Sequence, residues 1–208
     1  MTLRGRAIGD WSDASARVLV CSLFFALAWR FLSDFRATGR VTDLLLVVGE
    51  VLVVVLTCIR RPATIVDRRP MVRFVTMVSM LAPLMLRPAQ DTAIVPEAYA
   101  TILVGVGLII VVAGKISLGC SFGLLPANRG VMERGLYRVV RHPIYLGYLL
   151  THIPFLAAHP SAWNLGLLLV GDTTLLVRAL FEEQTLGRDP QYVRYCQNVK
   201  WRLVPGLC

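Results

Sequence analysis

The chain of 208 residues is long enough for one domain and leaves no room for a large second folding unit. Hydrophobic residues make up 56% of it and charged residues 17%, and the mean hydropathy is +0.63. This excludes an ordinary water-soluble domain, of which about a quarter is charged. The net charge of +9 does not indicate nucleic-acid binding, because the basic residues stand in short clusters between apolar runs, as at an anionic membrane surface.

Six apolar runs follow one another along the chain, and a spanning helix needs roughly 17 to 25 residues. The runs cover about residues 16–35, 42–59, 71–87, 96–114, 144–158 and 163–181. Pro83 and Pro154 interrupt the third and fifth runs, so we expect these two to be kinked or to span incompletely. The sequence therefore predicts an all-α, polytopic membrane bundle of about six transmembrane helices, or five if one run is re-entrant.

The N-terminal region precedes the first run with Arg4, Arg6 and Arg17. We expect a retained first helix there, and a cleaved signal peptide is the alternative.

The distribution of Lys and Arg predicts the orientation in a bacterial-type inner membrane or an equivalent bilayer. With the N-terminus inside, all but four of the 22 basic residues lie on the cytoplasmic side. Both termini are then cytoplasmic. The two long polar segments, about 115–143 and 182–208, are expected to face the cytosol together.

One of these segments contains "GLYRVVRHPIYLGYLL", residues 135–150. Pro143 suits the first position of a helix, which places His142 at or beside the N-cap, near unpaired amides that favour an electron-rich group. Tyr145 offers an aromatic face, and Gly147 would let a flat ligand approach the backbone. The alternative is an interfacial belt in which the arginines contact lipid headgroups.

A second cluster lies in "GDTTLLVRALFEEQTLG", residues 171–187. On a helix, Asp172, Arg178, Glu182 and Glu183 fall within an arc of roughly 140°. Ionisable groups on one side of a membrane helix normally face the protein interior or a wet cavity, which favours a functional site. A simple Arg178–Glu182 pair at i,i+4 is the alternative, and it leaves Asp172 and Glu183 unexplained.

Glu50 lies in the middle of the second run, where an acid is a functional candidate. It would line a cavity for a substrate, and a structural acid is the alternative. His152 and His159 are not assigned to a site. No grouping of His, Cys and acidic residues has the spacing of a metal site, so we expect no metal.

Two stretches together resemble the isoprenylcysteine carboxyl methyltransferase family. They are "ERGLYRVVRHPIYLGYLL" and "RALFEEQTLGRDPQYVRYCQNVKWRLVPGL". They join an R-H-P-x-Y-x-G element to an E-E pair and a closing Y-x-x-Y, here Tyr192 and Tyr195. The resemblance covers about residues 115–208. This family is part of a wider group of membrane methyltransferases that includes phospholipid methyltransferase-like proteins.

The resemblance implies a transferase that uses S-adenosylmethionine, with S-adenosylhomocysteine as product. It also implies a single membrane domain, 1–208, with N-terminal helices in 1–114 and a methyltransferase core in 115–208. The cofactor would lie between the cytoplasmic ends of the last helices and the C-terminal segment. A lipophilic acceptor would arrive from the bilayer. The partners are then this acceptor and membrane lipids, and the sequence does not indicate an oligomeric state.

Site residues carry over by matching position. The cofactor would be bound by Val131, Met132, Tyr137, His142, Tyr145, Gly147, Glu182 and Glu183. Arg178 matches an arginine at the acceptor's carboxylate, so Arg178 and Glu182 are the catalytic candidates, and Arg178 and Glu50 the acceptor-binding ones. One departure is the sequence "ANRGVM" at 127–132, where members acting on isoprenylcysteine carry a histidine. Asn128 or Arg129 would replace it, or the methionine portion is bound differently.

The acceptor group follows from charge. A carboxylate is already nucleophilic and needs only a cation to orient it, which Arg178 can supply through two hydrogen bonds. An amine would need a base, for which His142, Glu182 and Glu183 are candidates. We therefore expect carboxyl methylation, with phospholipid, amine or thiol methylation as alternatives. A small transporter or a non-catalytic scaffold is the alternative of another class.

Overall fold

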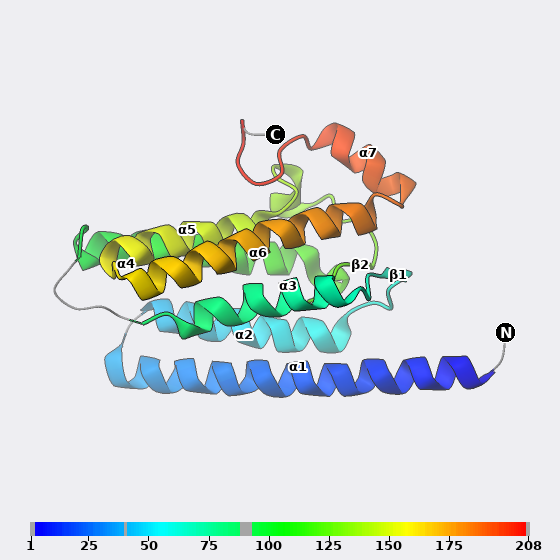
Figure 1. Ribbon diagram of the computed structural model, residues 1–208, viewed down its shortest axis with the longest axis horizontal. Coiled ribbons are helices and arrows are strands. Elements are labelled where there is room, and N and C mark those ends of the chain that lie inside the picture. The colour runs from blue at the N-terminus through cyan, green and yellow to red at the C-terminus, as the bar shows by residue number, and fades with distance from the viewer. Residues whose placement is uncertain (1–2, 40, 88–92, 207–208) are drawn as a thin grey trace.

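A computed structural model describes residues 3–39, 41–87 and 93–206. Long helices lie lengthwise beside one another, and the short helix α7 and the strands β1 and β2 lie at one end of the bundle (Figure 1), which we name the α7 end. The helices are α1 (Leu3–Thr38), α2 (Val41–Ile59), α3 (Pro70–Leu81), α4 (Glu97–Leu118), α5 (Pro143–Ala158), α6 (Ala162–Leu186) and α7 (Pro190–Asn198). Three short 3₁₀ helices are η1 (Ala82–Met85), η2 (Gly119–Ser121) and η3 (Gly135–Arg138).

The described residues contain four helices long and apolar enough to cross a membrane. They are Arg17–Ala37, Val41–Ile59, Ala98–Ser121 and Ala162–Leu186, and two shorter apolar helices are Pro70–Met85 and Pro143–Ala158. The chain is therefore a mostly helical integral membrane protein, as the sequence predicts. The two shorter helices correspond to the two runs that were expected to be kinked or incomplete.

Prolines and capping side chains explain where these helices begin and end. Pro83 converts the end of α3 into the 3₁₀ helix η1. Pro143 occupies the first turn of α5 and His142 is its N-cap residue, which confirms that part of the prediction. Ser161 accepts a hydrogen bond from the Asn164 amide at the start of α6, and Asp189 caps α7 in the same way.

The α7 end is closed by backbone hydrogen bonds between distant segments. β1 (Ile65–Val66) pairs antiparallel with β2 (Ala127–Asn128). The amides of Arg141 and His142 donate to the carbonyls of Trp201 and Arg202, both at 2.9 Å. The C-terminal tail is thus attached directly to the start of α5.

Gly147 lies in the contact between α4 and α5. A Cβ there would come within 2.7 Å of Val111 Cγ2 and 2.8 Å of the Gly107 carbonyl oxygen. This position of Gly147 in a helix–helix contact differs from the expected one beside a flat ligand. The absent side chain allows two helix backbones to approach each other, as is common for glycine in membrane bundles.

We expect Gly147→Ala to destabilise the protein by about 1–3 kcal/mol, because the added methyl group overpacks the α4–α5 contact. Thermal unfolding in detergent micelles measures the effect. Gly166→Ala on α6 is the matched control, since nothing lies within 4 Å of a Cβ at that position. Equal unfolding temperatures for the two variants would contradict this account of the contact.

Candidate active site

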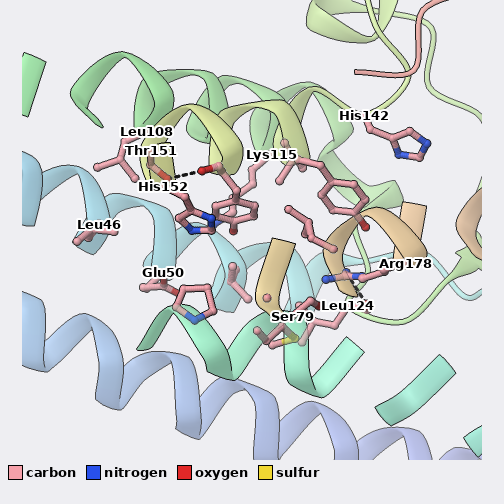
Figure 2. A pocket seen from close by; sticks show the side chains of 18 of the residues that line it. Leu46, Glu50, Ser79, Leu108, Lys115, Leu124, His142, Thr151, His152 and Arg178 are labelled. Carbon is pink, nitrogen blue, oxygen red and sulfur yellow. Dashed lines mark hydrogen bonds between the residues drawn. The ribbon is translucent and has the colours of Figure 1, made fainter. Parts of the chain in front are cut away.

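A cavity of about 1030 Å³ extends through the bundle from the α7 end. Its walls combine residues from all the long helices and from the segment between α4 and α5. Figure 2 shows the part of the cavity between His142, Arg178 and Glu50. Most predicted site residues line this one cavity: Glu50, Val131, Met132, Tyr137, His142, Tyr145, Arg178 and Glu182.

Glu183 lies at the α7 end and is held by three basic side chains. Its Oε1 is 3.0 Å from Arg141 Nη1 and 3.3 Å from His142 Nε2, and its Oε2 is 3.0 Å from Arg202 Nε. These contacts join α6 to the start of α5 and to the C-terminal tail. Glu183 itself is not among the lining residues of the cavity, so the geometry favours an anchoring role over the predicted cofactor contact.

Glu182 faces the cavity, and its neighbours are the groups that the sequence singled out. His142 Nδ1 is 3.6 Å from Glu182 Oε2, which is an ion-pair distance longer than a good hydrogen bond. Glu182 also interacts with Arg178 and Tyr145. The two neighbouring acids thus have different surroundings, one facing the cavity and one anchored outside it.

His142 is buried between these two carboxylates. Burial alone would lower the pKa of His142, but its contacts with Glu182 and Glu183 outweigh burial and raise the pKa above the ordinary 6.5. An imidazolium at this position is therefore stabilised by the paired acids.

Arg178 is buried and lines the cavity, with its position set by one short hydrogen bond. Its Nη2 donates to the Leu124 carbonyl oxygen at 2.6 Å, and its guanidinium lies over the Tyr145 ring, 5.4 Å from the centroid. Its Nε has no hydrogen-bond partner within the described part of the chain. A buried, unpaired N–H of a cation is a suitable donor for a carboxylate ligand.

Tyrosines form the wall of the cavity at the α7 end. The Tyr195 hydroxyl donates to the Tyr137 carbonyl oxygen at 2.7 Å, and Tyr192 packs against Tyr195. Burial raises the pKa of the Tyr137 and Tyr195 phenols, which keeps both neutral. The sequence motif contained Tyr192 and Tyr195, but neither was assigned a role, and both line the cavity.

The residues present fit S-adenosylmethionine. The cofactor carries a sulfonium, an amino group, a carboxylate and a flat adenine ring, and the cavity offers a carboxylate at Glu182, an unpaired donor at Arg178 and several aromatic faces. Tyr145 itself stacks on His142, with ring centroids 5.3 Å apart, and also contacts Arg178. The Tyr145 ring thus already has two neighbours, and Tyr137 and Tyr148 are further aromatic side chains in the cavity wall. Among the described residues, no cluster of His, Cys, Asp and Glu could hold a metal ion.

Sequence reasoning missed one further pair in the same cavity. His152 Nδ1 lies 2.6 Å from Asp172 Oδ1. The signal was present in the numbering, because α5 and α6 are antiparallel and His142 faces Glu182. His152 follows His142 by ten residues, and Asp172 precedes Glu182 by ten residues, so the second pair meets as the first does.

Residues 96–189 match the family model described as phospholipid methyltransferase. This match confirms the resemblance to the membrane methyltransferases that include the isoprenylcysteine carboxyl methyltransferases. A search of curated proteins finds no match.

The raised pKa of His142 predicts a pH dependence of stability. A histidine whose folded pKa lies above its unfolded value stabilises the fold fully below the unfolded pKa, and this contribution is lost as the pH rises through the folded pKa. We therefore expect the unfolding temperature to fall as the pH rises above about 6.5, and to fall less in His142→Gln. Thermal unfolding in micelles across this range checks the prediction. Parallel curves for the two proteins would show that His142 does not contribute.

Proposed function

We propose that this chain, whose residues 96–189 match the phospholipid methyltransferase family model, transfers a methyl group from S-adenosylmethionine to a lipophilic acceptor in the bilayer. The favoured acceptor group is a carboxylate. The observation that carries the proposal is that His142, Glu182 and Arg178 share one cavity with the apolar interior of the bundle. A polar cofactor and a lipophilic acceptor can therefore meet without leaving the protein.

When bound, S-adenosylmethionine supplies an electrophilic methyl group on a sulfonium cation. The residues of the chain then have to position two ligands and compensate charge. Glu182 and the aromatic wall would hold the cofactor's cationic groups. His142 supports this arrangement by fixing Glu182 and Glu183 at the end of α6.

Arg178 would orient the acceptor. Its Nη2 is already used by Leu124, whereas its Nε is buried and unpaired within the described residues. A carboxylate placed there needs no base, since it is ionised at neutral pH. Glu50, farther along the cavity, would contact the acceptor away from the reacting group.

A lipid amine is the second candidate acceptor, because the matching family is described as phospholipid methyltransferase. An amine has to lose a proton, and Glu182 lies in the cavity where it could accept one.

The first test is calorimetry of the purified protein with S-adenosylhomocysteine. We expect saturable binding, weakened about tenfold or more in Glu182→Gln because a charge-assisted hydrogen bond is lost. Glu133→Gln, at an exposed position near the same end, is the control and should bind as the unmodified protein does. A transporter or a scaffold would show no saturable binding.

The labelled product then identifies the acceptor group. With lipid extract and methyl-labelled cofactor, a carboxyl methyltransferase forms esters that release labelled methanol in alkali. Methylated amines keep their label under the same treatment. A fully alkali-stable product would therefore show that the acceptor group is an amine and not a carboxylate.

Arg178→Lys keeps the positive charge and removes the forked geometry. We expect kcat/KM for the acceptor to fall by about 30-fold or more, with little change in S-adenosylhomocysteine affinity, because a buried charged hydrogen bond contributes roughly 2–5 kcal/mol when one partner is altered. Arg194→Lys, exposed on α7, is the matched control. If the cofactor affinity fell and acceptor use did not, Arg178 would belong to the cofactor site instead.

A further inference from the structure

A second His–acid pair lies deeper in the cavity than the groups discussed so far. His152 of α5 and Asp172 of α6 are 2.6 Å apart, and both line the cavity. The pair repeats the His142–Glu182 relation ten residues farther along α5, which corresponds to about 15 Å of helix. Tyr145 and Tyr148 lie between the two histidines in the sequence of α5 and also line the cavity, and Tyr148 stacks on His152 with ring centroids 6.3 Å apart.

Glu50 of α2 and Lys115 of α4 line the same part of the cavity. Figure 2 shows Glu50 and His152 toward one end of the view, Arg178 toward the other, and Lys115 between them. Lys115 is 2% exposed, and its Nζ donates to the Gly49 carbonyl oxygen at 3.0 Å. The Glu50 Oε2 atom is buried and has no hydrogen-bond partner in the described ranges. We name Glu50, Lys115, His152 and Asp172 the inner polar site.

Four ionisable side chains in the interior of a membrane bundle are costly unless they serve a ligand or a pathway. Pairing compensates part of this cost, since Asp172 binds His152 and Lys115 supplies a positive charge near Glu50. The unpartnered Glu50 oxygen is not explained by pairing. A buried polar atom without a partner costs roughly 1–3 kcal/mol, which a ligand with a matching group would remove.

The available atoms indicate what kind of ligand group would match. With Nδ1 donating to Asp172, a neutral imidazole offers Nε2 as an acceptor. The Glu50 side chain also offers an acceptor oxygen. Two acceptors facing one cavity require a ligand that donates, such as a hydroxyl or an amine, and a hydrocarbon segment would leave both unsatisfied.

We propose that the inner polar site binds a hydroxyl or amine group carried by the methyl acceptor. Asp172 and Arg178 are six residues apart on α6, so this group lies about 9 Å from the group held at Arg178. The placement of the acceptor's reacting group at Arg178 rests on the proposed function. The acceptor class is then a lipophilic molecule with a second, hydrogen-bond-donating group along its chain, and a plain prenyl or alkyl chain is a poor ligand.

Binding of palmitate and of hydroxypalmitates tests the proposal on the full chain in detergent micelles. The hydroxyl is placed at successive carbons, so that the probes differ only in the position of one donor. We expect one isomer or two adjacent isomers to bind about five- to tenfold tighter than palmitate, as one or two hydrogen bonds would give. We expect His152→Phe, which keeps a ring against Tyr148, and Glu50→Gln to reduce this preference to below about twofold while palmitate affinity changes little.

Thr173→Val is the matched control, since Thr173 is exposed on α6 next to Asp172 and should keep the preference. Equal affinities for palmitate and every isomer, or a preference that His152→Phe and Glu50→Gln leave intact, would overturn the proposal. Cofactor binding is measured separately by calorimetry. If the protein does not bind S-adenosylhomocysteine but prefers a hydroxypalmitate, the proposed methyltransferase function is wrong and the proposal for the inner polar site still holds.

Discussion

The α7 end of this protein is organised by basic side chains that compensate the negative charge of one acid, Glu183. A carboxylate at the end of a membrane helix needs positive charge close by, and Glu183 receives it from Arg141, His142 and Arg202. The three partners come from the start of α5 and from the tail that follows α7. Because Glu183 is held in this way, the preceding residue, about 100° around the helix, is turned toward the cavity.

The same requirement recurs along the interior. His142 at the N-cap of α5 and His152 within α5 face acids of α6 at two levels of the bundle, and Lys115 of α4 compensates Glu50 of α2. The remaining interior of these helices is largely apolar, with Leu175, Ala179 and Ile144 forming a core around Tyr145. Polar groups are thus concentrated in one continuous cavity, and the helices around it present apolar surface to the lipid.

α4 and α5 pack closely against each other on one side of the cavity. Gly107 and Gly147 let the two helices approach each other, and Gly114 accommodates Ile144. At the opposite end of the bundle, Asn164 is fully buried and bonds Arg87 and His159, which connects η1 to the α5–α6 turn. α1 is different, since only 6% of the apolar window within its Arg17–Ala37 part is buried. α1 nevertheless lines the cavity together with α2 to α6, through residues such as Phe24 and Leu27.

Local features of the sequence determined the helices and the general position of the site. Apolar run length, Pro83, and the His142–Pro143 start of α5 act within a few residues, so their consequences can be derived without a structure. The gathering of Asp172, Arg178, Glu182 and Glu183 on one side of α6 follows from helix period in the same way. The two polar segments that were predicted to converge, about 115–143 and 182–208, meet in the structure, where His142 contacts both Glu182 and Glu183.

Only the tertiary structure decided how neighbouring groups divide their roles. It separated Glu182 from Glu183, placed Gly147 against α4, and joined His152 to Asp172. These outcomes depend on the register and rotation of one helix against another. A sliding of one helical turn would exchange the partners without altering the apolar period of any helix, so helix period alone could not specify them.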